Sequence, residues 1–211
     1  MLCLLTSVVL AAAPQIEMKE GVQFHTLTNP QPVTTGNQIE VIEAFSYGCI
    51  HCFQMEPSMR AWKQKLPKDV KLVLLPATFR PEFALYARGF YAAESLGMTD
   101  QVHEKVFDKI WDGGMAANNE QELINLYAQL GVDRTRFVAA LHSMGNGVLV
   151  NAAGDKAEKM GLEGTPSIYV DGKYQMLTSL AQSYDELFQR VDALIARARA
   201  ERKAPAAKAR S

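Results

Sequence analysis

Short apolar stretches at both ends of the chain have the pattern of β-strands. They are rich in β-branched residues and are bounded by segments rich in Gly, Pro, Asn and Thr. Near the C-terminus, two such stretches flank the dipeptide Asp171-Gly172, which is typical of a type I′ hairpin turn. The predicted strands are residues 22–27, 39–45, 70–75, 167–170 and 173–176.

The remaining segments have apolar residues at spacings of three and four, which predicts helices. The predicted helices are residues 53–66, 83–97, 101–111, 119–131, 133–145, 148–160 and 183–200. Side chains that accept a hydrogen bond from the first helical turn stand ahead of four of them. The predicted N-caps are Thr99 or Asp100, Asn118 or Asn119, Asp133, and Ser183 in a capping box with Glu186.

The order of these elements predicts a two-part α/β design. It reads β-β-α-β, then a block of helices, then β-β-α, so the flanking strands must meet in one sheet. The central block is too long to be a loop. We therefore predict a discontinuous sheet-bearing domain from residues 21–80 and 160–197, and an inserted all-helical subdomain from residues 81–159. The basic residues 198–211 are predicted to form a tail without fixed structure.

Composition and charge add a prediction about location. The chain has 211 residues, 48% of them hydrophobic, and a formal charge of −1, so we expect no nucleic acid as a partner. The first thirteen residues, MLCLLTSVVLAAA, are uncharged, end in small residues and resemble a secretory signal peptide. The alternative is a buried N-terminal element. Removal of this segment takes Cys3 with it and predicts a periplasmic protein with two cysteines, too few for a disulfide framework.

The two remaining cysteines form the motif Cys49-Ile50-His51-Cys52. If the first cysteine stands at a helix N-terminus, the free backbone N–H groups and the helix dipole stabilise its thiolate. Cys52 then lies one turn inside, and His51 offers a further donor beside Cys49. This predicts a redox-active pair. Two alternatives stay open at this point, which are half of a zinc site and a structural disulfide.

A second feature is the sequence Gly164-Thr165-Pro166, directly before the predicted hairpin. A proline that enters a strand cannot donate to the sheet, and the backbone of Thr165 is free to bind an extended peptide. By itself this is a weak signal. The signal becomes informative because the strand that follows Pro166 is predicted to lie in the same sheet as the strand that leads to the cysteine pair.

Both motifs together resemble the DsbA family of bacterial periplasmic oxidants. The similarity lies in EVIEAFSYGCIHCFQMEPSM and in GLEGTPSIYVDGKYQM, and it extends from about residue 21 to residue 196. The resemblance implies a thioredoxin-like fold with an inserted all-helical subdomain, and it requires no cofactor and no metal. It also implies roles for individual residues. These are Cys49 as nucleophile, Cys52 as resolving sulfur, Pro166 as a cis-proline, Thr165 as a substrate backbone contact, and Glu43 as a buried acid near Cys52.

The chain departs from the best-known members of that family at three places. Ile50 replaces a proline between the cysteines, and Thr165 replaces a valine before the cis-proline. The basic residue that pairs with the buried acid has no counterpart, because residues 72–74 read Leu-Val-Leu. We therefore expect a raised pKa for Glu43. Without the resemblance, Glu43 reads as a strand carboxylate at an edge of the sheet.

These observations predict a monomeric thiol:disulfide oxidoreductase that introduces disulfide bonds into exported proteins. Its predicted substrates are reduced exported polypeptides, and the resemblance implies reoxidation by a membrane quinone-linked partner similar to DsbB. One alternative is a disulfide isomerase or reductase of the same fold. Another is a non-enzymatic peptide-binding or chaperone-like module. A metal module is a third.

Overall fold

A computed structural model describes residue 16, residues 18–178 and residues 181–204. The predicted signal peptide, with Cys3, lies outside these residues. The described elements alternate between sheet and helix at both ends of the chain and are all helical in the middle. In order they are β1 (Phe24–Thr26), β2 (Ile39–Phe45), α1 (Ile50–Lys63), β3 (Val70–Pro76), α2 (Pro81–Ser95), α3 (Thr99–Trp111), α4 (Glu120–Gln129), α5 (Arg134–Leu141), α6 (Met144–Lys159), β4 (Ser167–Val170), β5 (Tyr174–Met176) and α7 (Tyr184–Lys203).

One mixed sheet joins the two ends of the chain, as predicted. Its strand order is β1-β5-β4-β2-β3. Strand β2 is parallel to β3 and antiparallel to β4, with Ala44 opposite Ser167. The β4–β5 turn has positive φ at Asp171 and Gly172, as a type I′ turn requires. A Cβ at Gly172 would lie 1.9 Å from the carbonyl oxygen of Gln31, so glycine is required there.

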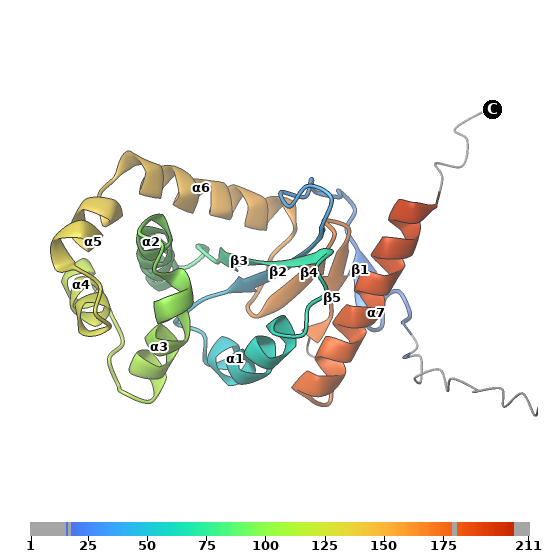
Figure 1. Ribbon diagram of the computed structural model, residues 1–211, viewed down its shortest axis with the longest axis horizontal. Coiled ribbons are helices and arrows are strands. Elements are labelled where there is room, and N and C mark those ends of the chain that lie inside the picture. The colour runs from blue at the N-terminus through green and yellow to red at the C-terminus, as the bar shows by residue number, and fades with distance from the viewer. Residues whose placement is uncertain (1–15, 17, 179–180, 205–211) are drawn as a thin grey trace, which may run out of the picture.

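The sheet separates two groups of buried side chains. Helices α1 and α7 pack on one face, where Val41 of β2 lies among apolar residues of both helices. Helices α2 to α6 follow β3 in the chain and lie on the other face and beyond its end (Figure 1), where Ile42 and Phe45 join their core. This second core also includes Cys49 and Cys52, and it is continuous from the sheet to helices α2 to α6. The division into separate domains at residues 80 and 160 stays a prediction.

Helix starts are where the sequence reading is least accurate. Helix α1 begins at Ile50, three residues before the predicted start. Neither Thr99 nor Asp100 caps α3. The cap residue is Met98, because Gly97 reverses the chain so closely after α2 that no extended residue is left to act as a cap. Asn119 and Asp133 do cap α4 and α5 as predicted.

Two other helices also differ from the prediction. Helix α6 begins at Met144 rather than near residue 148, since the hydroxyl of Ser143 accepts the N–H of Asn146 and starts it. Helix α7 is capped by Ser183 as predicted, but the carboxylate of Glu186 accepts the N–H of Gln182, so the capping box is only half formed.

The C-terminal helix is longer than predicted. It continues to Lys203, so residues 198–203 are helical and the tail does not start at residue 198. The guanidinium of Arg202 pairs with the buried Asp171 in the hairpin turn, and Arg199 pairs with Asp69 at 2.6 Å. These partners fix the last turns of the helix. Among the helices described, none combines the length and the apolar character that a membrane span requires.

Candidate active site

Two neighbouring strands bring the two sequence motifs together. Strand β2 ends at Phe45 and leads through a short loop to Cys49, while β4 begins at Ser167, directly after Pro166. The Thr165–Pro166 peptide bond is cis, as the resemblance implied. Because β2 and β4 are adjacent in the sheet, the cysteine motif and the proline loop lie side by side.

Cys49 is the N-cap residue of α1. Its sulfur accepts the N–H of Cys52 at 3.4 Å and lies 3.3 Å from the carbonyl oxygen of Thr165. The pKa of Cys49 is lowered to about 5. The largest influence is a hydrogen bond with the side chain of Cys52, and burial acts in the opposite direction. The side chain of Thr165 and the backbone N–H groups of Cys52 and His51 lower the pKa further. The predicted stabilisation of a thiolate at the helix N-terminus is confirmed in direction.

Cys52 lies in a different environment only three residues away. It is fully buried, whereas 8% of Cys49 is exposed. Burial raises the pKa of Cys52 far above that of an ordinary thiol, and the neighbouring sulfur of Cys49 adds to this. No disulfide joins the two cysteines in this structure. The outer sulfur, that of Cys49, therefore ionises readily and the inner sulfur of Cys52 does not.

The side chain of His51 does not take the place that the sequence suggested. The imidazole is exposed, and its Nδ1 lies 3.3 Å from the amide oxygen of Gln54. The contribution of His51 to the thiolate comes from its backbone N–H instead. The physical reason is the helix itself, since side chains at i and i+3 meet on the surface of α1 and this contact directs the ring along the helix.

Glu43 lies beneath the cysteines in the middle of β2. It is 1% exposed, and neither carboxylate oxygen has a hydrogen-bond partner among the residues described. Burial raises the pKa of Glu43 well above its usual value, and the negative charges of Glu56 and Cys49 add to the effect. The expected direction is confirmed. Strand β2 is an inner strand, so the reading of Glu43 as an edge carboxylate is wrong.

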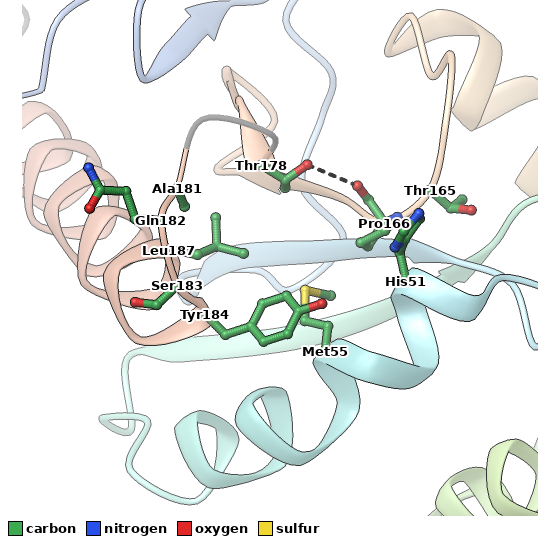
Figure 2. A pocket seen from close by; sticks show the side chains of 10 residues that line it. All are labelled: His51, Met55, Thr165, Pro166, Thr178, Ala181, Gln182, Ser183, Tyr184 and Leu187. Carbon is green, nitrogen blue, oxygen red and sulfur yellow. Dashed lines mark hydrogen bonds between the residues drawn. The ribbon is translucent and has the colours of Figure 1, made fainter. Parts of the chain in front are cut away.

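A groove beside the cysteines was not predicted. It has a volume of about 520 Å³ and connects the proline loop with the start of α7 (Figure 2). Its lining residues come from three segments that are distant in the sequence, namely His51, Met55, Thr165, Pro166, Thr178, Ala181, Gln182, Ser183, Tyr184 and Leu187. Figure 2 shows Thr165, Pro166 and His51 together at one end and Tyr184 and Leu187 toward the other. No local pattern marks these residues, because the groove exists only after α7 packs against α1.

The described residues hold no group of three or more histidine, cysteine or acidic side chains arranged to bind a metal ion. In the conformation described, the two cysteines contact each other, the helix N-terminus and the proline loop. This geometry is suited to thiol–disulfide exchange, which needs one accessible thiolate and a second sulfur within reach of it.

Comparison with known proteins agrees with this site. Residues 82–192 match the family described as the DSBA-like thioredoxin domain. The sequence is 33% identical to the thiol:disulfide interchange protein DsbA of Pseudomonas syringae over 193 residues, which are 92% of this chain and 89% of that protein. The chain belongs to the DsbA family. It is a thiol:disulfide oxidoreductase with a thioredoxin-like fold.

Solved structures of DsbA proteins have the same architecture. A crystal structure of a variant of Pseudomonas aeruginosa DsbA matches with a TM-score of 0.84 and 32% sequence identity. This match covers 87% of this chain and 100% of that chain. Reduced DsbA1 from Neisseria meningitidis, at 24% identity, shares the fold with a TM-score of 0.77 over 89% of this chain and 98% of that chain. The predicted fold, a thioredoxin-like sheet with an all-helical insertion, is therefore confirmed.

Proposed function

We propose that this protein oxidises dithiols in exported polypeptides, rather than reducing or isomerising disulfides. The observation that carries the proposal is the contrast between the two sulfurs. The pKa of Cys49 is about 5, and that of Cys52 is raised above the ordinary thiol value. A stable Cys49 thiolate favours the reduced enzyme, which makes the disulfide form a strong oxidant.

The proposed reaction has two exchange steps. A substrate thiolate attacks the sulfur of Cys49 in the Cys49–Cys52 disulfide, the bond between the two enzyme sulfurs breaks, and Cys52 leaves with the electron pair and takes up a proton. A second substrate thiolate then attacks the substrate sulfur of the mixed disulfide and displaces Cys49 as a thiolate. The substrate loses two electrons and the enzyme gains them. The low pKa of Cys49 makes it a good leaving group in the second step.

Three further residues receive roles in this reaction. The carbonyl group of Thr165 is in contact with Cys49 and is placed to bind the backbone of an extended substrate beside Pro166. Glu43, whose pKa is raised by burial, is the proposed proton donor to Cys52 when that sulfur leaves. His51 lines the groove and is proposed to contact the substrate rather than the thiolate.

The groove indicates that the substrate is a polypeptide. It combines apolar walls, which include Met55 and Leu187, with polar groups such as the hydroxyl of Tyr184. An extended segment next to the reacting cysteine would bury apolar side chains there. A Tyr184→Ala variant is expected to raise KM for an unfolded polypeptide about tenfold. Oxidation of a small dithiol, which does not reach the groove, is the control and is expected to be unchanged.

The location and the partners follow from the same reading. Disulfide exchange with protein substrates is supported by the named relatives. The uncharged N-terminal segment supports export to the periplasm, where the reduced pair would be returned to the disulfide form by a membrane quinone-linked oxidase. We further propose that the protein acts as a monomer. Sedimentation of the mature protein with and without reductant tests this point.

The direction of the reaction is tested by the redox potential of the Cys49–Cys52 pair in glutathione buffers. We expect a value more positive than about −180 mV, together with rapid oxidation of a reduced two-cysteine peptide. A potential near about −270 mV, typical of thioredoxin, would instead identify a reductase. A Cys49→Ser variant is expected to be inactive. A Cys52→Ser variant has no internal disulfide and should not oxidise the reduced peptide, but its Cys49 thiolate should form a mixed disulfide when the peptide is supplied in its disulfide form. A Cys49→Ser variant with full activity would exclude the proposed mechanism.

A further inference from the structure

A small cavity lies under the active-site helix, on the side away from the groove. It has a volume of about 50 Å³, and buried polar groups of β2, α1 and α3 line it. These are Glu43, Glu56, Thr99 and His103, and we call the space that they enclose the acid cavity. Four of the oxygen atoms on Glu43, Glu56 and Thr99 have no hydrogen-bond partner within the described part of the chain. A cavity of this size and polarity can hold a water molecule, which needs about 10–15 Å³.

The rim of the acid cavity is formed by charged side chains at the surface. Arg60 of α1 pairs with Glu104 of α3, and Lys63 pairs with Asp100 at 3.3 Å. All four of these residues also line the cavity. These ion pairs are exposed, so they open and close easily. The buried acids are thus separated from solvent by one layer of mobile side chains.

His103 is the basic residue of this cluster, and each of its two ring nitrogens faces a polar side chain. The Nδ1 atom lies 2.8 Å from the hydroxyl of Tyr47, and the Nε2 atom lies 3.5 Å from a carboxylate oxygen of Glu56. Burial raises the pKa of Tyr47, so its hydroxyl keeps its proton and can either donate to a bare Nδ1 or accept from a protonated one. The other ring nitrogen, Nε2, faces Glu56.

The surroundings of His103 are otherwise apolar. Its ring makes edge contacts with Phe45, Phe90 and Phe107, and only 8% of the residue is exposed. The Glu56 oxygen nearest to the ring is the one without a hydrogen-bond partner, so the 3.5 Å contact is an ion pair when the imidazole is protonated and is not a hydrogen bond. A buried glutamate is costly without a charged or hydrogen-bonded partner, and His103 is close enough to supply one. The contact with Glu56 therefore points to a use of the ring that goes beyond filling space.

We propose that His103 is a positioning residue for the reaction, which holds Glu56 opposite Glu43 and passes protons between the acid cavity and the rim. The inference rests on the proposed role of Glu43 as proton donor to Cys52. It extends that role, because proton transfer to Cys52 leaves Glu43 as a buried carboxylate without a hydrogen-bond partner, which is costly until a proton reaches it from the rim.

The proton balance of this step is complete. When Cys52 leaves as a thiolate, the carboxyl group of Glu43 gives it a proton and becomes a carboxylate. A protonated His103 then gives up its Nε2 proton, which reaches Glu43 through Glu56, and His103 regains a proton from solvent at the rim. In reoxidation of the enzyme, the same groups carry the proton outward from the Cys52 thiol.

The pH dependence of this transfer involves every charged group that faces the ring. Glu43 lies on β2, and Tyr47 on the loop that follows it. Glu56, Arg60 and Lys63 lie on α1, and Asp100 and Glu104 lie on α3 with His103 itself. The neighbouring residue of α2 that contacts the ring is the uncharged Phe90. The transfer is therefore tested over the range between about pH 5 and 8, in which imidazole side chains in general change charge.

The test is a comparison of multiple-turnover rates as a function of pH, because the relay returns a proton to Glu43 only after Cys52 has left. Each full-length variant oxidises an excess of one reduced peptide with glutathione disulfide as the reoxidant, and the rate is divided by the wild-type rate at the same pH, so that ionisation of the peptide cancels. His103→Phe keeps the aromatic packing and His103→Gln keeps a hydrogen bond. Both are expected to lower the rate about tenfold, with a ratio that changes between about pH 5 and 8. The Cys49 thiolate titration should stay as in the wild type.

His142 provides the matched control. It also pairs with a glutamate, with its Nε2 2.9 Å from Glu120, but it lies at the exposed end of α5. His142→Gln is expected to react at the wild-type rate at each pH. A ratio below one that does not vary with pH would assign His103 a purely structural role and overturn the proposal.

A Glu43→Gln variant separates this inference from the proposed function. If Glu43→Gln slows the reaction while both His103 variants react as the wild type does, the role of Glu43 stands and that of His103 falls. If Glu43→Gln also reacts normally, both fall. If the two residues belong to one proton path, the double variant is no slower than the slower single variant. Should His103→Phe not fold, His103→Gln and Tyr47→Phe still decide the question.

Discussion

The sulfur of Cys49 lies 3.3 Å from the carbonyl oxygen of Thr165, although 116 positions separate the two residues in the chain. The contact joins the N-terminus of α1 to the cis-proline loop. It places the reacting sulfur next to the backbone that is proposed to bind the substrate. The chemistry of Cys49 is therefore determined by the proline loop as well as by the helix.

Thr165 provides the first prediction. The side chain of Thr165 is among the groups that lower the pKa of Cys49. Thr165→Val removes the hydroxyl and keeps the shape, so the pKa of Cys49 should rise from about 5 by about one unit. The ultraviolet absorbance of the thiolate measures it. Thr165→Ser keeps the hydroxyl and should titrate like the wild type; equal titration of all three proteins would contradict the prediction.

The second prediction concerns the stability of the reduced form. The pKa of Cys49 is lower in the folded protein than in the unfolded chain, so its contribution to stability is lost as the pH falls toward about 5. The pKa of Cys52 is raised, so its contribution is lost only above the ordinary thiol pKa of about 8.5. The free energy of unfolding of the reduced form, relative to that of the disulfide form, should therefore increase as the pH rises from about 5 to about 8.5. Urea unfolding of both forms across this range measures it, and a constant difference would contradict it.

The third prediction concerns Ile50, the first residue of α1. Its N–H has no hydrogen-bond acceptor among the described residues, and Cys49 before it is extended, with φ −104° and ψ 112°. Both conditions suit a proline at this position. Ile50→Pro should therefore stabilise the protein by about 0.4–1 kcal/mol.

The same substitution should leave the pKa of Cys49 unchanged, because the backbone donors to the sulfur are His51 and Cys52. Ile50→Ala, which loses the side chain but keeps the N–H, is the matched control. Chemical denaturation and thiolate titration of both variants provide the measurement. A clear rise in the pKa of Cys49 in the proline variant alone would show that the N–H of Ile50 also stabilises the thiolate.

The fourth prediction tests the last turns of α7. A chain that ends after residue 197 loses Arg199, the partner of Asp69. It also loses Arg202, the hydrogen-bonded partner of the buried Asp171, which keeps only the longer contact with Lys173 at 3.8 Å. We expect a loss of about 2–4 kcal/mol in the free energy of unfolding, mostly from the buried carboxylate. A chain that ends after residue 204 keeps these pairs and should unfold as the full chain does. Equal stability of the two shortened chains would show that the helix end contributes nothing.

The sequence predicts those parts of the fold that depend on local pattern. Strand β2 has the predicted bounds, and the hairpin turn at Asp171 is of the predicted type, because strand periodicity and turn residues act over a few positions. The direction of the Cys49 pKa was also predictable, since a helix N-terminus stabilises an anion wherever it occurs.

Features that depend on contacts between distant segments were not predictable. The imidazole of His51 turns to Gln54 because of the geometry of α1, and the groove requires α7 to pack against α1. His103 stands within a predicted helix, and no local motif in the sequence distinguishes it. Its pairing with Glu56 arises from the packing of α3 on α1, which no single segment of the sequence reveals.

The pairing of Ala44 with Ser167 has a consequence for how such a protein can vary. The cysteine motif follows the end of β2 and the proline loop precedes the start of β4, so both are attached to the same end of the paired strands β2 and β4. Helices α2 to α6 lie between β3 and β4 in the chain and are not part of this pairing. The register of β2 and β4 therefore keeps the cysteines and the proline loop together independently of the lengths of the connections between α4, α5 and α6. For protein engineering, these connections are the places where the length of the chain can change, whereas α2 and α3 share a core with Cys49 and Cys52 and have to be kept.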